Sequence, residues 1–274
     1  MSTVAFDPAR DGGRRAAWRV YGYMLLRYKR TWRGTLTTSF LYPVLYLLAM
    51  GVGLGHLVDA HLAASGSRGR LGGATYVEFI APGLLAATSM QLASNEAMYP
   101  VMHGLKWVRS YHAMIAAPIT VRHVQLGHLA WIATRLASSA AIFLCILAAF
   151  GDVGSPLAVL ALPCAVLTGL AFAAPIMAFT ATQENDNAFS LLYRMGIVPL
   201  FLFSGTFFPL SQLPGFLQII ARATPLYHGV ALCRGLVLGR LSLASAVAHV
   251  GYLIALVTIG LIAGGITFRR RLSK

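Results

Sequence analysis

Charged side chains are scarce in this sequence. Only 11% of its 274 residues are charged and 57% are hydrophobic, whereas a soluble domain carries about 25% charged residues. Too few charges remain to cover a water-facing surface of this size. The apolar residues come in runs of roughly 20, the length that crosses a hydrocarbon layer about 30 Å thick. A soluble globular protein is therefore excluded, and the even spread of these runs predicts a single all-α integral membrane domain.

Motifs for catalysis are lacking too. The chain has no GxxxxGK(S/T) phosphate loop, no HExxH zinc motif and no GxSxG nucleophile elbow. The three cysteines lie far apart in apolar stretches without a CxxC pair, as small buried hydrophobic residues do: Cys145, Cys164 and Cys233. Four histidines gather around one loop without the spacing of metal ligands: His103, His112, His123 and His128. We therefore expect no catalytic residue, no cofactor and no metal in this chain.

The apolar runs predict six transmembrane helices. Before them, Trp18, Tyr21 and Tyr28 recur at helical spacing opposite a basic face, which is typical of a helix in the headgroup layer. Residues 209–229 hold two apolar pieces too short to cross a bilayer, which favours an outward-facing re-entrant helical hairpin. The expected order is a polar tail (1–13), an interfacial helix (14–33), spans at about 36–57, 76–98, 125–150, 157–180, 191–208 and 243–268, the hairpin (209–229) and a basic tail (269–274), with residues 14–268 forming one transmembrane domain.

The formal net charge of +14 indicates membrane orientation rather than a nucleic-acid partner, because the basic residues lie at the ends and in the loops. The N-terminal segment, the connections 99–124 and 181–194 and the C-terminal tail hold 16 Lys and Arg together, and the other three connections hold 5. Positively charged loops stay in the cytoplasm. Both termini are therefore expected in the cytoplasm, which an even number of spans satisfies.

Few charged residues fall inside the predicted spans. Glu96 and Arg135 both lie toward the cytoplasmic side of their spans and are able to pair across helices, locking the bundle near its cytoplasmic mouth. No acidic residue lies clearly near the midplane, which counts against a proton- or sodium-driven carrier. In the first span, Gly51 and Gly55 have the GxxxG spacing of closely packed membrane helices.

Two strings carry a family resemblance. LFSGTFFPLSQLPGFLQIIARATPLYHGVALCRGLVLG, residues 202–239, and HGLKWVRSYHAMIAAPITVRHVQLGHLAW, with MIAAP at 114–118, resemble the signature region and the coupling segment of type-2 ATP-binding-cassette (ABC) transporter permeases. YPVLYLLAMGVGLG at 42–55, YVEFIAPGLLAATSM at 76–90 and GHLAWIATR at 127–135 are similar to the subgroup that exports lipo-oligosaccharide nodulation signals, and to its drug-exporting relatives. The chain departs from the family at Met102 and His103, where acidic residues are common.

The resemblance implies a permease subunit in a bacterial cytoplasmic membrane, which exports a lipo-oligosaccharide, a lipid-linked glycan or an amphipathic drug. It implies a second permease copy, expected as a homodimer, and a separate ATPase subunit in two copies that holds ATP and Mg. The implied ATPase-coupling residues are Gly104, Lys106, Trp107, Arg109, Ala117, Pro118, Glu184 and Asp186. The candidate translocation or gate residues, taken from this resemblance, from the charges inside the spans and from the aromatic residues of the fifth span, are Glu96, Arg135, Phe203, Ser204, Gly205, Phe208, Pro209, Pro214, Pro225 and His228.

Two other classes stay open at this point. A membrane-embedded lipid or glycan transferase would need a convergent acid, base or metal set, for which the His103–His128 loop is the candidate. An ion-coupled secondary transporter would be driven by a proton or sodium gradient without ATP.

Overall fold

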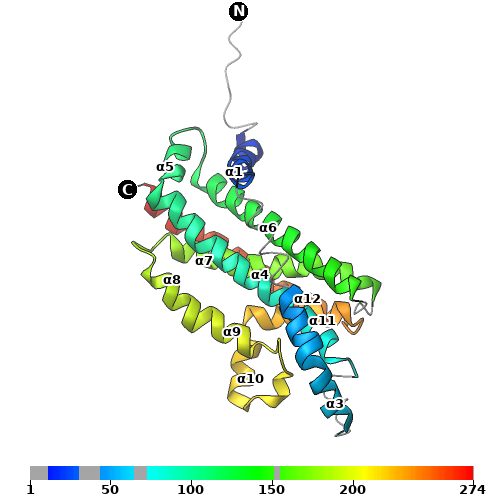
Figure 1. The fold of residues 1–274 in the computed structure, drawn as a ribbon. Helices are drawn as coiled ribbons and strands as arrows, with labels where there is room; N and C mark the ends of the chain where they lie inside the picture. The colour runs from blue at the N-terminus through cyan, green and yellow to red at the C-terminus, as the bar shows by residue number, and fades with distance from the viewer. Residues whose placement is uncertain (1–11, 31–43, 65–72, 151–154, 274) are drawn as a thin grey trace, which may run out of the picture.

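The computed structural model describes residues 12–30, 44–64, 73–150 and 155–273. Every regular element in these ranges is helical. Figure 1 shows the long helices side by side, with α5 and the C-terminus at one end of the bundle and α3 and α10 at the other. The elements are α1 Gly12–Tyr28, η1 Leu48–Gly55, α3 His56–Ala64, α4 Tyr76–Met102, η3 His103–Trp107, α5 Ser110–Ile115, α6 Val121–Ala149, η4 Pro156–Leu160, α7 Ala161–Thr180, α8 Asn187–Leu192, η5 Tyr193–Ile197, α9 Val198–Phe203, η6 Leu210–Gln212, α10 Gly215–Arg222, α11 Pro225–Val237 and α12 Leu243–Leu272.

Four helical segments of the described ranges are long and apolar enough to cross a membrane. They are Val44–His61, Val121–Ala149, Pro156–Thr180 and Leu243–Leu272. Four of the six predicted spans are therefore matched by such segments. The helix Asn187–Phe203 is apolar but shorter, and α4 does not belong to this set although it has 27 residues. Both stay predictions as spans.

The reason that α4 is less apolar is its place inside the bundle. It contacts η1, α6, α7 and α11, and most of its residues are buried by protein. Polar side chains there bond to their own helix, as the Ser94 hydroxyl does by donating to the Met90 carbonyl at 2.7 Å. A helix that faces other helices needs small, well-packed residues rather than a continuous apolar surface. Thr75 and Glu78 form a capping box that fixes its first turn.

The structure corrects several predicted boundaries. The first helix continues past residue 57 to Ala64, and its start before residue 44 lies outside the described residues. The helix of the fifth predicted span ends at Phe203 instead of 208, because Gly205 has a positive φ of 82° that the α-helix does not allow. The hairpin region forms α10 and then α11, which reaches Val237 rather than ending at 229. Proline explains where both begin, since Pro214 precedes α10 and Pro225 opens α11.

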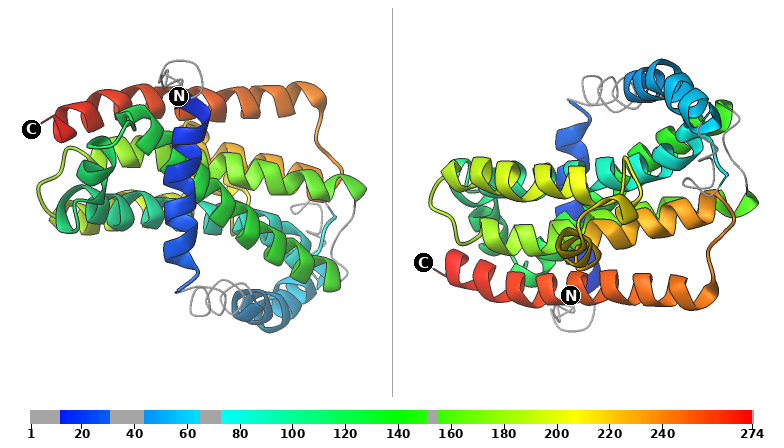
Figure 2. Two further views of the ribbon diagram at one scale, coloured as in Figure 1. Left: turned by 90° about the horizontal axis from the view of Figure 1, so that it is seen from above. Right: turned by 90° about the horizontal axis from the view of Figure 1, so that it is seen from below.

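Helix α1 lies across the bundle rather than along it (Figure 2). It packs on α6, where Gly127 allows close approach: a Cβ there would lie 2.6 Å from the Cβ of Val20. The predicted interfacial helix would turn its aromatic side chains toward lipid. Instead, the rings of Tyr21 and Tyr28 contact Trp131 of α6, while Trp18 remains exposed. The N-terminal helix is thus joined to the bundle through its aromatic face. Residues 31–33 of the predicted interfacial helix lie outside the described residues.

The predicted glycine packing in the first helix is only partly described. A Cβ at Gly55 would lie 3.6 Å from Val77 of α4, which is ordinary van der Waals contact. Gly55 therefore sits near α4 without a demand for glycine. Gly51 lies in η1, and what surrounds it is outside what the structure describes.

Candidate functional site

Tyr111 anchors the loop between α4 and α6. This loop with η3 and α5, the start of α6 and the last turns of α12 together form what we call the α5 end. The Tyr111 side chain is fully buried and its hydroxyl bonds to Nδ1 of His128 in α6. Its ring lies 6.2 Å from that of Phe268 in α12. Burial raises the pKa of the Tyr111 phenol, so it remains a neutral hydrogen-bonding group. The loop is thereby connected to two long helices.

Gly104 leaves the space that the Tyr111 ring occupies. A Cβ at this position would lie 2.5 Å from the ring, closer than any real side-chain contact. The predicted importance of Gly104 therefore has a steric basis that only the tertiary contact reveals.

The tip of the same loop is exposed and carries both apolar and basic side chains. Trp107 is 52% exposed and Val108 56% exposed, between Lys106 and Arg109, which are also exposed. Arg109 turns the chain into α5 with a left-handed φ of 53°. Ala117 and Pro118, which follow α5, are exposed as well. An exposed tryptophan flanked by cations is typical of an interaction surface.

Glu184 joins the second predicted coupling loop to the first. The Lys106 ammonium donates to the Glu184 carbonyl, and the Glu184 carboxylate pairs with Arg271 near the end of α12. Arg271 Nη2 lies 3.1 Å from Oε2 of this carboxylate. Asp186, just before α8, is exposed. The structure therefore brings the two loops and the end of α12 together.

Glu96 and Arg135 form the ion pair that the sequence allowed. Arg135 Nη1 of α6 lies 3.2 Å from Glu96 Oε1 of α4, and their side chains are 11% and 15% exposed. The Arg135 guanidinium also lies 4.8 Å from the centre of the Tyr28 ring in α1. The pair borders a cleft of about 160 Å³ whose lining includes Arg27 and Trp131. One ion pair thus connects α1, α4 and α6.

We expect Glu96→Gln to lower stability by about 3 kcal/mol, because it leaves the Arg135 charge buried without its counter-ion. The double variant Glu96→Gln/Arg135→Gln should lose less than the sum of the two single variants, since neither charge then remains. Thermal unfolding in detergent measures both effects. Additive losses in the double variant would show that the two groups do not interact.

The predicted gate region at the α10 end is tied down by Arg234, a residue absent from the predicted site. Its Nε donates to the Phe79 carbonyl at 2.9 Å, and its Nη2 donates to the carbonyls of Gly205 and Thr206 at 2.9 and 3.1 Å. Its guanidinium lies 3.7 Å from the centre of the Phe79 ring. Arg234 therefore fastens the turn after α9 to the first turns of α4. The signal in the sequence was an arginine inside an apolar helical stretch.

The remaining predicted gate residues divide between buried and exposed positions. Ser204 is buried and bonds to the Thr206 hydroxyl at 2.9 Å, whereas Phe203 is exposed at the end of α9 and Phe208 is partly buried. Pro209 precedes the short helix η6. The structure thus brings Ser204 and Gly205 together under Arg234 and leaves Phe203 outside this group.

His228 pairs with a histidine that the predicted site omitted. Its Nδ1 lies 2.8 Å from Nδ1 of His249 in α12, so one ring donates and the other accepts. Its ring also stacks on Tyr252 with centroids 3.9 Å apart. This contact joins α11 to α12 nearly two turns after the start of α12 at Leu243.

The histidines near the α4–α6 loop have separate contacts. His103 Nδ1 lies 3.4 Å from Arg27 Nη1, and burial together with this arginine lowers the pKa of His103. His123 forms a capping box with Thr120 at the start of α6, and His128 is buried against Tyr111. Within the described ranges, no group of three or more His, Cys, Asp or Glu is placed to hold a metal ion.

Comparison with known proteins gives both a family and full-length relatives. A family model described as ABC-2 type transporter matches residues 16–238. Nodulation protein J of Rhizobium leguminosarum bv. viciae is 32% identical over 272 residues, which are 99% of this chain and 99% of that protein. Nodulation protein J of R. leguminosarum bv. trifolii is 32% identical over 94% of each chain, and that of Rhizobium meliloti (strain 1021) is 29% identical over 98% and 97%.

Proposed function

This chain belongs to the ABC-2 type transporter family, and we propose that it is the membrane-spanning permease subunit of an ATP-driven exporter. The observation that carries the proposal is the family match over residues 16–238, joined to similarity along the whole chain with Nodulation protein J. In this role the chain moves cargo by alternating between conformations, and a separate ATPase supplies the energy.

We propose six spans with both termini in the cytoplasm of a bacterial cell, so that the α5 end faces the cytoplasm. Support comes from the Lys and Arg residues of this end, which include Lys106, Arg109, Arg122 and Arg269, because such residues stay on the cytoplasmic side. Helix α4 then crosses the bilayer inside the bundle, and α8 to α9 supply the fifth span. Helices α10 and α11 form the re-entrant hairpin on the outer side.

The exposed tip at Trp107 to Arg109 is the proposed docking point of the ATPase. Trp107 and Val108 offer apolar area, and the flanking cations suit acidic groups on the partner. A push on this tip reaches α6 and α12 through Tyr111, and it reaches the 182–187 loop through Lys106 and Glu184. ATP and Mg would be held by the two ATPase copies.

A second copy of this chain is the proposed membrane partner. The first span, Val44–His61, has only 12% of its residues buried, and α8 to α9 expose Leu191, Met195 and Leu202. These sparsely covered helices leave area for a homodimer contact, and lipid covers what remains exposed.

The proposed cargo is a lipo-oligosaccharide, a lipid-linked glycan or an amphipathic drug, as the resemblance to lipo-oligosaccharide exporters indicates. The carboxylates described in α4 support ATP rather than an ion gradient as the energy source, because both have structural partners. Glu96 pairs with Arg135, and Glu78 belongs to the capping box at the start of the helix.

We expect the purified chain alone to hydrolyse no ATP and to recover hydrolysis when it is co-expressed with its ATPase. Trp107→Asp/Arg109→Asp should lower the amount of co-purified ATPase by at least about tenfold, since it removes apolar area and reverses a charge at the docking point. Trp18→Asp is the matched control, because Trp18 is also an exposed tryptophan but belongs to α1 rather than to this tip. Uptake or export driven by a proton or sodium gradient without ATP would contradict the proposal.

A further inference from the structure

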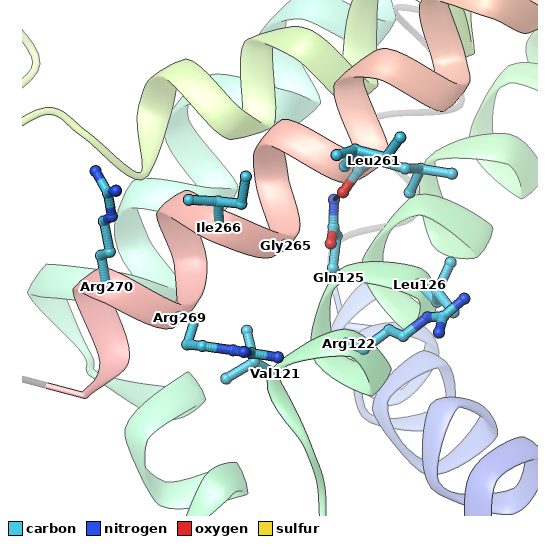
Figure 3. Close-up of a pocket in the computed structure, with 10 residues that line it drawn as sticks. Val121, Arg122, Gln125, Leu126, Leu261, Gly265, Ile266, Arg269 and Arg270 are labelled. Atoms are coloured by element: carbon cyan, nitrogen blue, oxygen red, sulfur yellow. Dashed lines mark hydrogen bonds between the residues drawn. The ribbon is translucent and has the colours of Figure 1, made fainter.

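A groove of about 520 Å³ lies between the start of α6 and the last turns of α12, at the α5 end. Figure 3 shows how the two helices frame it, with Gln125 reaching from α6 to the backbone of α12. Gln125 is buried and its Nε2 donates to the Leu261 carbonyl at 3.1 Å. The close approach is possible because Gly264 has no side chain: a Cβ there would lie 2.2 Å from the Gln125 amide. This contact forms the floor of the groove.

Positive charge gathers at one end of the groove. Arg122 of α6 and Arg269 of α12 are exposed and line it, and in the described ranges neither has an ion-pair partner. Figure 3 shows Arg269 extending toward Val121 at the start of α6 and Arg122 extending away from it on the Leu126 side, while Arg270 leaves the other side of α12. Arg271, by contrast, is paired with Glu184 outside the groove. None of the described lining residues is acidic.

The rest of the groove is apolar and open. Leu126 lies one turn beyond Arg122 on α6, and Ile266 and Ile262 lie one and two turns before Arg269 on α12. Ile262 is 63% exposed and Ile266 50% exposed. Because α6 begins and α12 ends at the α5 end, both helices present a basic side chain first and apolar side chains deeper. The groove therefore has the same polarity as a phospholipid, a charged head above an apolar chain.

We propose that this groove binds an anionic phospholipid, with Arg122 turning from its place in Figure 3 to share the phosphate with Arg269, and with an acyl chain along Leu126, Ile266 and Ile262. Guanidinium groups bind phosphate oxygens through paired hydrogen bonds, and basic pockets between helices on the cytoplasmic side suit anionic headgroups. The absence of a carboxylate among the described lining residues favours a headgroup with net negative charge over a zwitterionic one. The inference rests on the proposed function only in placing the α5 end at the cytoplasmic leaflet.

Native mass spectrometry of the full-length chain in detergent tests this site, with phosphatidylglycerol and phosphatidylcholine as the added lipids. The wild-type chain should retain phosphatidylglycerol in preference to phosphatidylcholine. Arg122→Gln/Arg269→Gln should bind phosphatidylglycerol at least about tenfold more weakly, which corresponds to the loss of one or two charge-assisted hydrogen bonds. The affinity of Arg122→Lys/Arg269→Lys for phosphatidylglycerol should lie between those of the wild type and of the glutamine double variant. The lysines keep the positive charge but lose the paired hydrogen-bond geometry of the guanidinium groups. Thermal unfolding checks that each variant is folded.

The matched control is Lys106→Gln/Arg109→Gln, which removes two exposed positive charges from the same end but outside the groove. It should bind phosphatidylglycerol as the wild type does. Equal losses in the two double variants would overturn the proposal in favour of general attraction to the basic surface. So would equal retention of the two lipids by the wild type.

The apolar side chains of the groove allow an experiment to distinguish binding of a lipid from binding of a free anion. Ile262→Asn/Ile266→Asn should weaken phosphatidylglycerol binding while both arginines remain, and inorganic phosphate at millimolar concentration should not displace the lipid. Displacement by inorganic phosphate, or lipid binding insensitive to the isoleucine changes, would overturn the lipid assignment. None of these measurements uses an ATPase or cargo, so failure of the export proposal is distinguishable from failure of this one.

Discussion

In the proposed exporter, Gly104→Val is expected to reduce ATP-driven export by at least about tenfold, the size of a typical coupling free energy. The valine side chain would overlap the Tyr111 ring, since even a Cβ would lie 2.5 Å from it. Relief requires Tyr111 to leave its buried position and to give up its hydrogen bond to His128, and with it the contact that joins the loop to α6. Overpacking of this kind costs about 1–3 kcal/mol, so the thermal midpoint should fall as well.

Two variants separate loss of coupling from loss of stability. Gly251→Val on α12 is the steric control, because its Cβ would meet nothing within 4 Å, and it should export normally. Gly104→Val/Tyr111→Ala gives the valine room, so stability should partly recover while export stays low without the Tyr111 anchor. Export that recovers in step with stability would contradict a coupling role for Tyr111. Transport into inverted vesicles together with thermal unfolding provides both measurements.

Arg234→Gln is expected to have the largest effect on stability, a loss of about 3–5 kcal/mol. Three backbone carbonyls from two distant segments, those of Phe79, Gly205 and Thr206, would lose their charged donor together. Gln is shorter and cannot span both segments. The turn after α9 should then separate from α4 and become sensitive to protease, with export falling in parallel.

Arg222→Gln is the control for this change, because Arg222 is an exposed arginine at the end of α10. It should leave protease resistance and the thermal midpoint unchanged. Arg234→Lys should be nearly as harmful as Arg234→Gln, since a lysine ammonium cannot reproduce the planar donor geometry. If Arg234→Gln unfolded at the wild-type temperature and resisted protease equally, the bonds of Arg234 would not be holding the turn.

The apolar runs predicted helices best where the helices have much exposed surface. Helix α12 begins at Leu243 as expected, and its predicted end at 268 is only four residues short of Leu272. The prediction failed most clearly at the end of α9, where a positive φ at Gly205 terminates a run that is still apolar in sequence. A hydropathy pattern records whether lipid or protein can surround a residue, not the backbone angle that it adopts.

The candidate site was predicted in part, and the missing residues share one property. Lys106 and Glu184 were named as members of two loops, and the structure joins them directly. Arg234, which lies in the resembling string 202–239, and His249 were left out of the predicted site because their partners, Phe79 and His228, lie far away in the sequence. Nothing local distinguishes an arginine that fastens two helices from one that reaches an interface.

The amino-acid sequence alone determined that this protein lies in a membrane. It also determined the positions of four long helices along the chain and the family to which the chain belongs. The first two properties follow from composition and from local order, because lipid selects apolar residues wherever it touches a helix, and the family follows from sequence similarity. Only the tertiary structure decided that α4 is enclosed by protein, that Tyr111 fills the space beside Gly104 and that Arg122 and Arg269 line one groove. These depend on the rotation of each helix and on its distance from its neighbours, which packing of the whole bundle fixes.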